Sequence, residues 1–106
     1  MGPLQGVKVV EFSGIGPGPY CGMLLADLGA DVIRISRKET EGLENKFDIH
    51  NRSKRTITAD LKNKESVKEL LKLIGQVDVV FEGFRPGVME KLGLGPDECL
   101  KVNPKL

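Results

Sequence analysis

GIGPGPYCGMLLADLGADVIRISR, residues 14–37, is the most informative part of the sequence. It opens with a glycine- and proline-rich loop that predicts the start of a helix, because proline in the first helical turn costs no hydrogen bond. The helix is expected to reach Leu28, and Gly29 is suited to end it in the left-handed conformation. Residues 31–36, DVIRIS, then have the β-branched character of a strand. We expect the large apolar residues of the helix to face inward: Tyr20, Leu24, Leu25 and Leu28.

The rest of the chain continues this alternation of strands and helices. Buried or short strands are predicted at residues 7–12 (VKVVEF), 55–60 (RTITAD) and 77–82 (VDVVFE). A helix capped by Asn63 and closed by Gly75 carries apolar residues at helical spacing, namely Val67, Leu70, Leu71 and Ile74. Shorter helices are expected at 86–92 and 97–102, and a polar loop at 38–54. The pattern predicts an α/β fold with a Rossmann-like parallel sheet and helices on both faces.

The composition limits the class of protein. The 106 residues include 16 basic and 15 acidic side chains, a net charge of +1 that argues against a general nucleic-acid binder. Cys21 and Cys99 make no disulfide framework and are expected to be reduced, partly buried thiols of an intracellular protein. No apolar run is long enough to cross a bilayer, and no targeting segment is evident. A further strand is expected after KVNPKL at residues 101–106, so residues 1–106 are interpreted as one segment of a longer chain.

The glycine-rich loop does not fit the common nucleotide motifs. The G-x-G-x-x-G fingerprint fails at Pro19, and Ser36 and Arg37 stand where an acid would hold the ribose of NAD. No GK[ST] sequence follows the loop, which excludes a P-loop. Arg37 and Arg85 each follow a predicted strand, and parallel strands would bring both to one edge of the sheet. Two guanidinium groups and a glycine loop there predict a phosphorylated, nucleotide- or CoA-like ligand.

The remaining polar residues carry weaker signals. His50 has no carboxylate at a suggestive spacing, and we interpret it as a surface residue. Asp27, Asp31 and Asp60 are interpreted as caps and turn formers. One histidine and two distant cysteines cannot build a zinc site, so no metal is expected.

Three blocks, in order, carry a resemblance to a known family. Residues 14–37, NRSKRTITADLK at 51–62 and EGFRPGVMEKLGLGPDE at 82–98 resemble the N-terminal part of the family III CoA transferases of the CaiB/BaiF type. Within that family the chain is most similar to the racemases of 2-methylacyl-CoA thioesters, because it has GIGPGP and VIRISR where the transferases carry an AGP loop and VIKVE. The resemblance implies a CoA-binding domain of an isomerase of fatty acid metabolism. The alternatives are an acyl-CoA transferase and a non-catalytic CoA-binding fragment.

The resemblance also implies site residues and partners. The CoA site would be built by Ile15, Arg37, Thr58, Ala59, Asp60, Leu61, Lys62, Arg85 and Lys91. The histidine and aspartate that move the α-proton in the racemases follow a block that would lie after Leu106, so no catalytic residue is expected in this chain. CoA is part of the substrate and no separate cofactor is implied. The family implies an interlocked homodimer, located in mitochondria or peroxisomes in eukaryotes and in the cytoplasm of bacteria.

Overall fold

The computed structural model describes residues 2–14, 16–37 and 49–106, and within them it has a four-stranded parallel sheet in the order β3-β2-β1-β4. The strands are β1 (Lys8–Phe12), β2 (Asp31–Arg37), β3 (Arg55–Ala59) and β4 (Val79–Phe81). The helices are α1 (Pro17–Asp27), α2 (Lys64–Ile74), α3 (Val88–Lys91) and α4 (Pro96–Val102), with a short 3-10 helix η2 at Ile49–Asn51. All strand pairs are parallel, as the alternation predicted.

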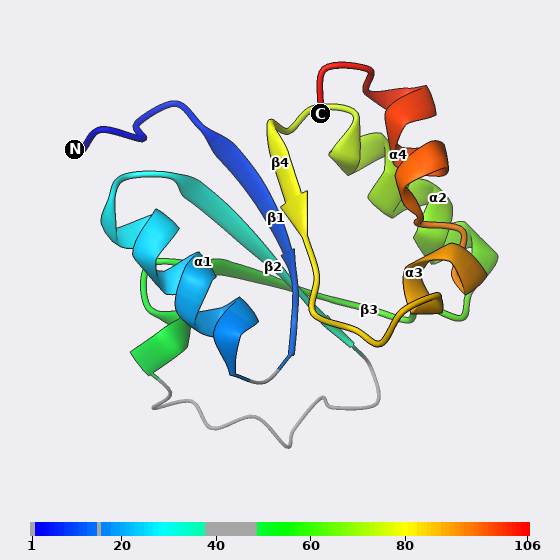
Figure 1. Ribbon diagram of the computed structural model, residues 1–106, viewed down its shortest axis with the longest axis horizontal. Helices are drawn as coiled ribbons and strands as arrows, with labels where there is room; N and C mark the ends of the chain where they lie inside the picture. The colour runs from blue at the N-terminus through cyan, green and yellow to red at the C-terminus, as the bar shows by residue number, and fades with distance from the viewer. Residues whose placement is uncertain (1, 15, 38–48) are drawn as a thin grey trace.

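Helices cover both faces of the sheet, which confirms the predicted fold class. Figure 1 shows α1 on one face and α2, α3 and α4 on the other. Two separate apolar cores result, because alternate strand residues point to opposite faces. Val9 and Val32 pack with Ala26 and Ala30 beneath α1. On the other face Val10, Phe12, Ile33 and Ile35 pack with residues of α2, α3 and α4.

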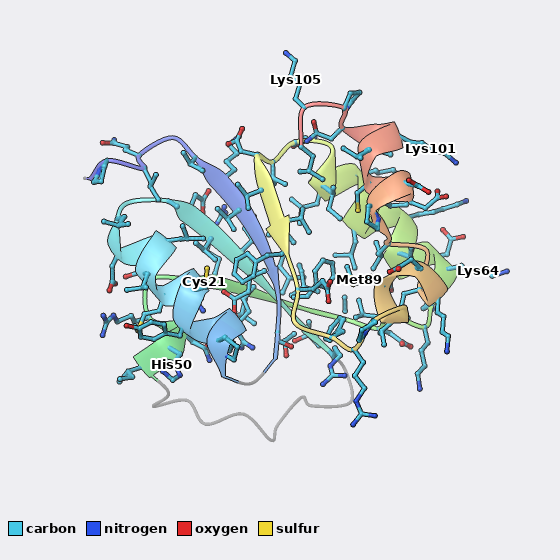
Figure 2. All side chains as sticks on the ribbon, in the orientation of Figure 1. Cys21, His50, Lys64, Met89, Lys101 and Lys105 are labelled. Atoms are coloured by element: carbon cyan, nitrogen blue, oxygen red, sulfur yellow. The ribbon has the colours of Figure 1, made fainter. Side chains whose placement is uncertain are left out.

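The helix α2 forms where its periodicity predicted it. The Asn63 side chain accepts hydrogen bonds from the backbone N–H groups of Glu65 and Ser66 at 2.8 and 3.2 Å, which caps the helix. Leu70 and Ile74 are buried in the core. Figure 2 shows that Lys64 and Lys101 point away from the body of the protein. Met89 of α3 points inward and is buried.

The expected inward face of α1 is wrong for three of its four residues. Tyr20, Leu24 and Leu28 are 51%, 42% and 45% exposed, and only Leu25 packs against the core. The buried side of α1 consists of Pro19, Gly22, Met23 and Ala26. Gly22 leaves the space beneath the helix in which the carboxylate of Glu11 lies. The large residues are therefore on the opposite face, where they leave an apolar stripe in solvent.

The strand β4 is shorter and less buried than predicted. It spans three residues, and Val79 is 39% exposed because no described strand pairs with the outer edge of β4. Strand β3, at the other edge, is also largely exposed. The two edge strands depart from the continuous burial that the apolar sequence suggested, while the central β1 and β2 follow it. No helix in the described part of the chain has the length and apolar character needed to span a bilayer.

Candidate functional site

A small cavity lies at the carboxyl edge of the sheet, where β2 and β3 end. Its volume is about 220 Å³, and it is lined by Arg37, Leu61, Lys62, Phe84, Val88 and Leu92. The guanidinium carbon of Arg37 lies 5.3 Å from the centre of the Phe84 ring, within the range of a cation–π contact. The cavity therefore combines an apolar wall with two cationic side chains, an arrangement suited to a ligand that carries both a flat ring and a phosphate.

Strand register places Arg37 beside the turn that follows β3. Arg37 is the last residue of β2 and is paired with Ala59 of β3. The carboxylate of Asp60 accepts a hydrogen bond from the backbone N–H of Lys62 at 3.1 Å, which shapes the turn after the strand. Leu61 is buried there, while Lys62 is exposed at the rim. The sequence prediction that these residues lie together is consistent with this geometry.

Phe84 is a lining residue that the sequence analysis missed. Its backbone N–H donates to the carboxylate of Glu82 at 2.8 Å, and its ring meets Phe12 edge-on with 6.3 Å between ring centres. These contacts hold the ring beside Arg37. The signal was present in EGFRPG at 82–87, where an aromatic residue immediately precedes the arginine that was singled out.

The structure does not bring every predicted residue to this cavity. Arg85 lines a different, larger cavity of about 820 Å³ between β4, α3 and α4. Thr58 and Lys91 are exposed, and neither lines the small cavity. Ile15 lies outside the described residues. The cavities share Phe84, so Arg85 is a neighbour of the small cavity through that residue and not one of its lining groups.

Two aspartates interpreted as caps form ion pairs instead. Asp27 accepts two hydrogen bonds from the Arg52 guanidinium at 3.1 and 2.6 Å, and these bonds lower the pKa of Asp27. Asp31 is held in the same bidentate way by Arg55. Both pairs lie at the surface, where such contacts add little stability. Only Asp60 has the predicted role in a turn.

The remaining reactive side chains do not gather into a catalytic cluster among the described residues. His50 is half-buried, and its ring meets that of Tyr20 edge-on at 6.3 Å, so it is less exposed than predicted. Cys21 is exposed and Cys99 buried; burial raises the pKa of the Cys99 thiol, and nearby Glu98 adds to the shift. No group of three or more potential metal ligands occurs in the described ranges.

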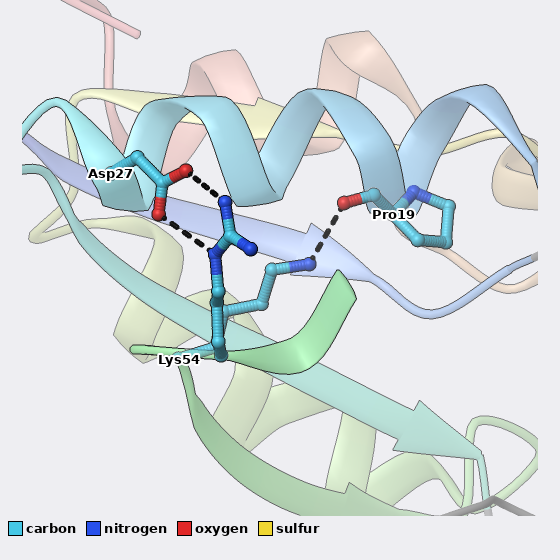
Figure 3. A network of polar contacts seen from close by, with 4 residues as sticks. Pro19, Asp27 and Lys54 are labelled. Atoms are coloured by element: carbon cyan, nitrogen blue, oxygen red, sulfur yellow. Dashed lines mark hydrogen bonds and ion pairs between the residues drawn. The ribbon is translucent and has the colours of Figure 1, made fainter. Parts of the chain in front are cut away.

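A buried ion pair lies beneath α1, on the face of the sheet opposite α2. The Lys54 ammonium is 2.8 Å from one carboxylate oxygen of Glu11 and 3.1 Å from the other, and neither side chain is exposed. Lys54 also donates to the backbone carbonyl of Pro19 at 3.1 Å, as Figure 3 shows. Burial raises the pKa of Glu11, an effect that the hydrogen bond and charge of Lys54 and the charge of Arg34 oppose. Sequence analysis did not single out either member of this pair.

Comparison with known proteins points to one family. The model of CoA-transferase family III matches residues 4–106. The chain is 50% identical to the α-methylacyl-CoA racemase of Mus musculus over 97% of its own length and 26% of the relative. It is 40% identical to a probable fatty acyl-CoA transferase of Mycobacterium tuberculosis, over 98% of its own length and 30% of the relative. A crystal structure from M. tuberculosis matches 100% of the chain and 32% of its own, with a TM-score of 0.90 and 39% identity. The chain thus spans about a quarter to a third of these relatives.

Proposed function

The chain belongs to CoA-transferase family III, and we propose that it is the CoA-binding N-terminal segment of a 2-methylacyl-CoA racemase. The identity of 50% to the murine racemase supports this assignment over other reactions of the family. On this proposal residues 1–106 hold the CoA part of the thioester. The histidine and aspartate that remove and return the α-proton would lie in the larger part of the relatives that this chain does not span.

The cavity at the end of β2 and β3 is the observation that carries the proposal. CoA bears an adenine ring and several phosphates, and the cavity offers the Arg37–Phe84 contact for a ring and the charges of Arg37 and Lys62 for phosphate. Its small volume matches part of such a ligand and not the whole. We propose that CoA extends from it along the sheet edge, over the residues that the family resemblance names: Ile15, Thr58, Ala59, Asp60, Leu61, Arg85 and Lys91.

A CoA transferase is the second candidate, and the identity of 40% to the mycobacterial acyl-CoA transferase favours it. Both candidates need the same CoA site, so the geometry of that site does not separate them. In the longer protein, exchange of the α-proton of 2-methylacyl-CoA with solvent would identify the racemase. Transfer of CoA to a free carboxylate would identify the transferase. An interlocked homodimer, with each active site shared between two subunits, belongs to either proposal.

Substituting Arg37 by alanine is expected to weaken CoA binding by about 1–3 kcal/mol, the range for a charge-assisted hydrogen bond. Calorimetric titration of the 106-residue chain with CoA measures the effect. The matched control is Arg55→Ala, which removes an exposed arginine paired with Asp31 and should leave the dissociation constant unchanged. Equal affinities of the wild-type chain and Arg37→Ala would show that Arg37 is not part of the CoA site. No binding of CoA by the wild-type chain would count against the proposed function.

A further inference from the structure

We propose that residues 50–54, here called the strap, position the glycine–proline loop of the CoA site, and that Lys54 is the positioning residue within it. This inference rests on the proposed function. The strap contacts α1 at three places along the helix. The His50 ring meets Tyr20, the Arg52 guanidinium binds Asp27 at the last residue of α1, and the Lys54 ammonium binds the carbonyl of Pro19 in the first turn. Figure 3 shows the two polar contacts, one near each end of the helix.

The first turn of α1 has little to hold it from within the helix. Its N-cap is Gly16, whose φ of 81° lies in the left-handed region, and no side chain caps the helix. No acidic residue in the first turn stabilises the helix dipole. By contrast, α2 begins with an Asn63 cap and Glu65. The contact from Lys54 therefore supplies an anchor that the sequence of α1 does not provide.

Lys54 is itself held by buried polar contacts, and a positioning residue requires such support. Its ammonium is fully buried and paired with both carboxylate oxygens of Glu11, a residue in the middle of the central strand β1. Gly22 of α1 leaves the space for this pair, since a Cβ at that position would lie 1.8 Å from the Glu11 carboxylate. The first turn of α1 is thus tied through Lys54 to the buried central strand β1.

The loop that this anchor holds lies next to the candidate site. The backbone N–H of Ser13, directly before the loop, donates to the carbonyl of Ile35 at 2.9 Å. Ile35 is two residues before Arg37 on the same strand, so the loop leaves β1 beside the end of β2. A shift of the first turn of α1 would move the loop relative to Arg37. Lys54 acts on the site through this loop, because it lines neither cavity.

The double variant Glu11→Gln/Lys54→Met tests the inference. It removes both buried charges at nearly constant volume, so it avoids the uncompensated carboxylate that Lys54→Met alone would leave. We expect a folded chain whose CoA dissociation constant is raised about tenfold. This change corresponds to a glycine–proline loop that adopts its binding position in about one-tenth of the molecules. The second readout is amide hydrogen exchange at Tyr20, which donates to the Gly16 carbonyl in the first turn of α1. This exchange should become faster, while exchange at Val67, the equivalent position in the first turn of α2, stays unchanged.

The outcomes separate this inference from the proposed function. Weaker CoA binding together with faster exchange at Tyr20 supports a positioning role. Wild-type affinity in the double variant overturns it, as does unchanged exchange at Tyr20. Equal acceleration at Tyr20 and Val67 would show a general loss of stability and would also overturn it. If the wild-type chain binds no CoA, the proposed function fails and the inference about the site fails with it.

Discussion

Replacing Lys54 by methionine is expected to lower the free energy of unfolding by about 3–5 kcal/mol at pH 7, because it leaves a buried carboxylate without its cation. Glu11 is completely buried in β1. Lys54 donates a hydrogen bond to its Oε2 and holds the ammonium 2.8 Å from its Oε1. Urea denaturation of the two chains measures the difference. The control is Lys72→Met, which breaks an exposed pair with Glu69 and should change stability by less than about 0.5 kcal/mol.

The loss of unfolding free energy caused by Lys54→Met should become smaller as the pH is lowered from 7 toward about 5. Burial raises the folded-state pKa of Glu11 above its ordinary 4.5, and removing Lys54 takes away influences that lower it. A carboxyl whose pKa is raised by folding contributes stability below its unfolded pKa and loses that contribution as the pH rises through the folded pKa. The difference between wild type and Lys54→Met should therefore narrow on acidification, and other titrating groups largely cancel in this difference. If the difference in stability between the two chains stays constant or becomes larger on acidification, Glu11 is not the group left uncompensated.

Substituting Gly22 by alanine is expected to destabilise the protein by about 3 kcal/mol, although alanine is the better helix former by about 1 kcal/mol. The new Cβ would lie 1.8 Å from a carboxylate oxygen of Glu11 and 3.0 Å from the Lys54 ammonium. Overpacking costs about 1–3 kcal/mol, and displacement of the buried pair adds to it. Thermal or urea denaturation gives the sign and size of the change in the free energy of unfolding.

Gly18→Ala, in the same helix, is the matched control for this prediction. Apart from its two chain neighbours, a Cβ at Gly18 would meet no atom within 4 Å. The helix preference of alanine is opposed there by the contact of its Cβ with the ring of Pro19, so this substitution should change stability by less than about 1 kcal/mol. A large loss of stability for Gly22→Ala beside a small change for Gly18→Ala would locate the destabilisation in the contact with Glu11. A stabilising effect of Gly22→Ala would mean that the ion pair does not occupy the space beneath α1.

Much of the fold was predictable because local signals agreed with the tertiary structure. The apolar spacing in α2, its Asn63 cap and the β-branched runs of β1 and β2 each gave the right element. The face of α1 was predicted wrongly because large apolar residues were assumed to point inward. A buried ion pair fills that space, and it favours small residues such as Gly22 on the inner face. Such a long-range charge pair leaves no periodic pattern in the sequence: residues 11 and 54 are far apart in the chain.

The candidate site, like the fold, was predictable in part from local signals in the sequence. Arg37, Leu61 and Lys62 lie next to strand ends, and parallel pairing brings strand ends to one edge of a sheet, so the topology was sufficient to group them. Arg85 was grouped with them on the same argument, yet it follows β4 by several residues, and the loop carries it to the other cavity. Phe84 was missed because the position of an aromatic ring in a loop depends on contacts such as those with Phe12 and Glu82, which spacing alone does not indicate.

Nuclear magnetic resonance of the chain titrated with CoA locates the residues that CoA contacts. On addition of CoA, we predict that the largest chemical-shift changes occur at the residues that line the small cavity, above all Arg37, Leu61, Lys62 and Phe84. Dephospho-CoA, which lacks the 3′-phosphate, should produce smaller changes at Arg37 and Lys62 at the same concentration. Changes confined to the larger cavity around Val79 and Leu100, or no change at the carboxyl edge of the sheet, would contradict a CoA site at the small cavity.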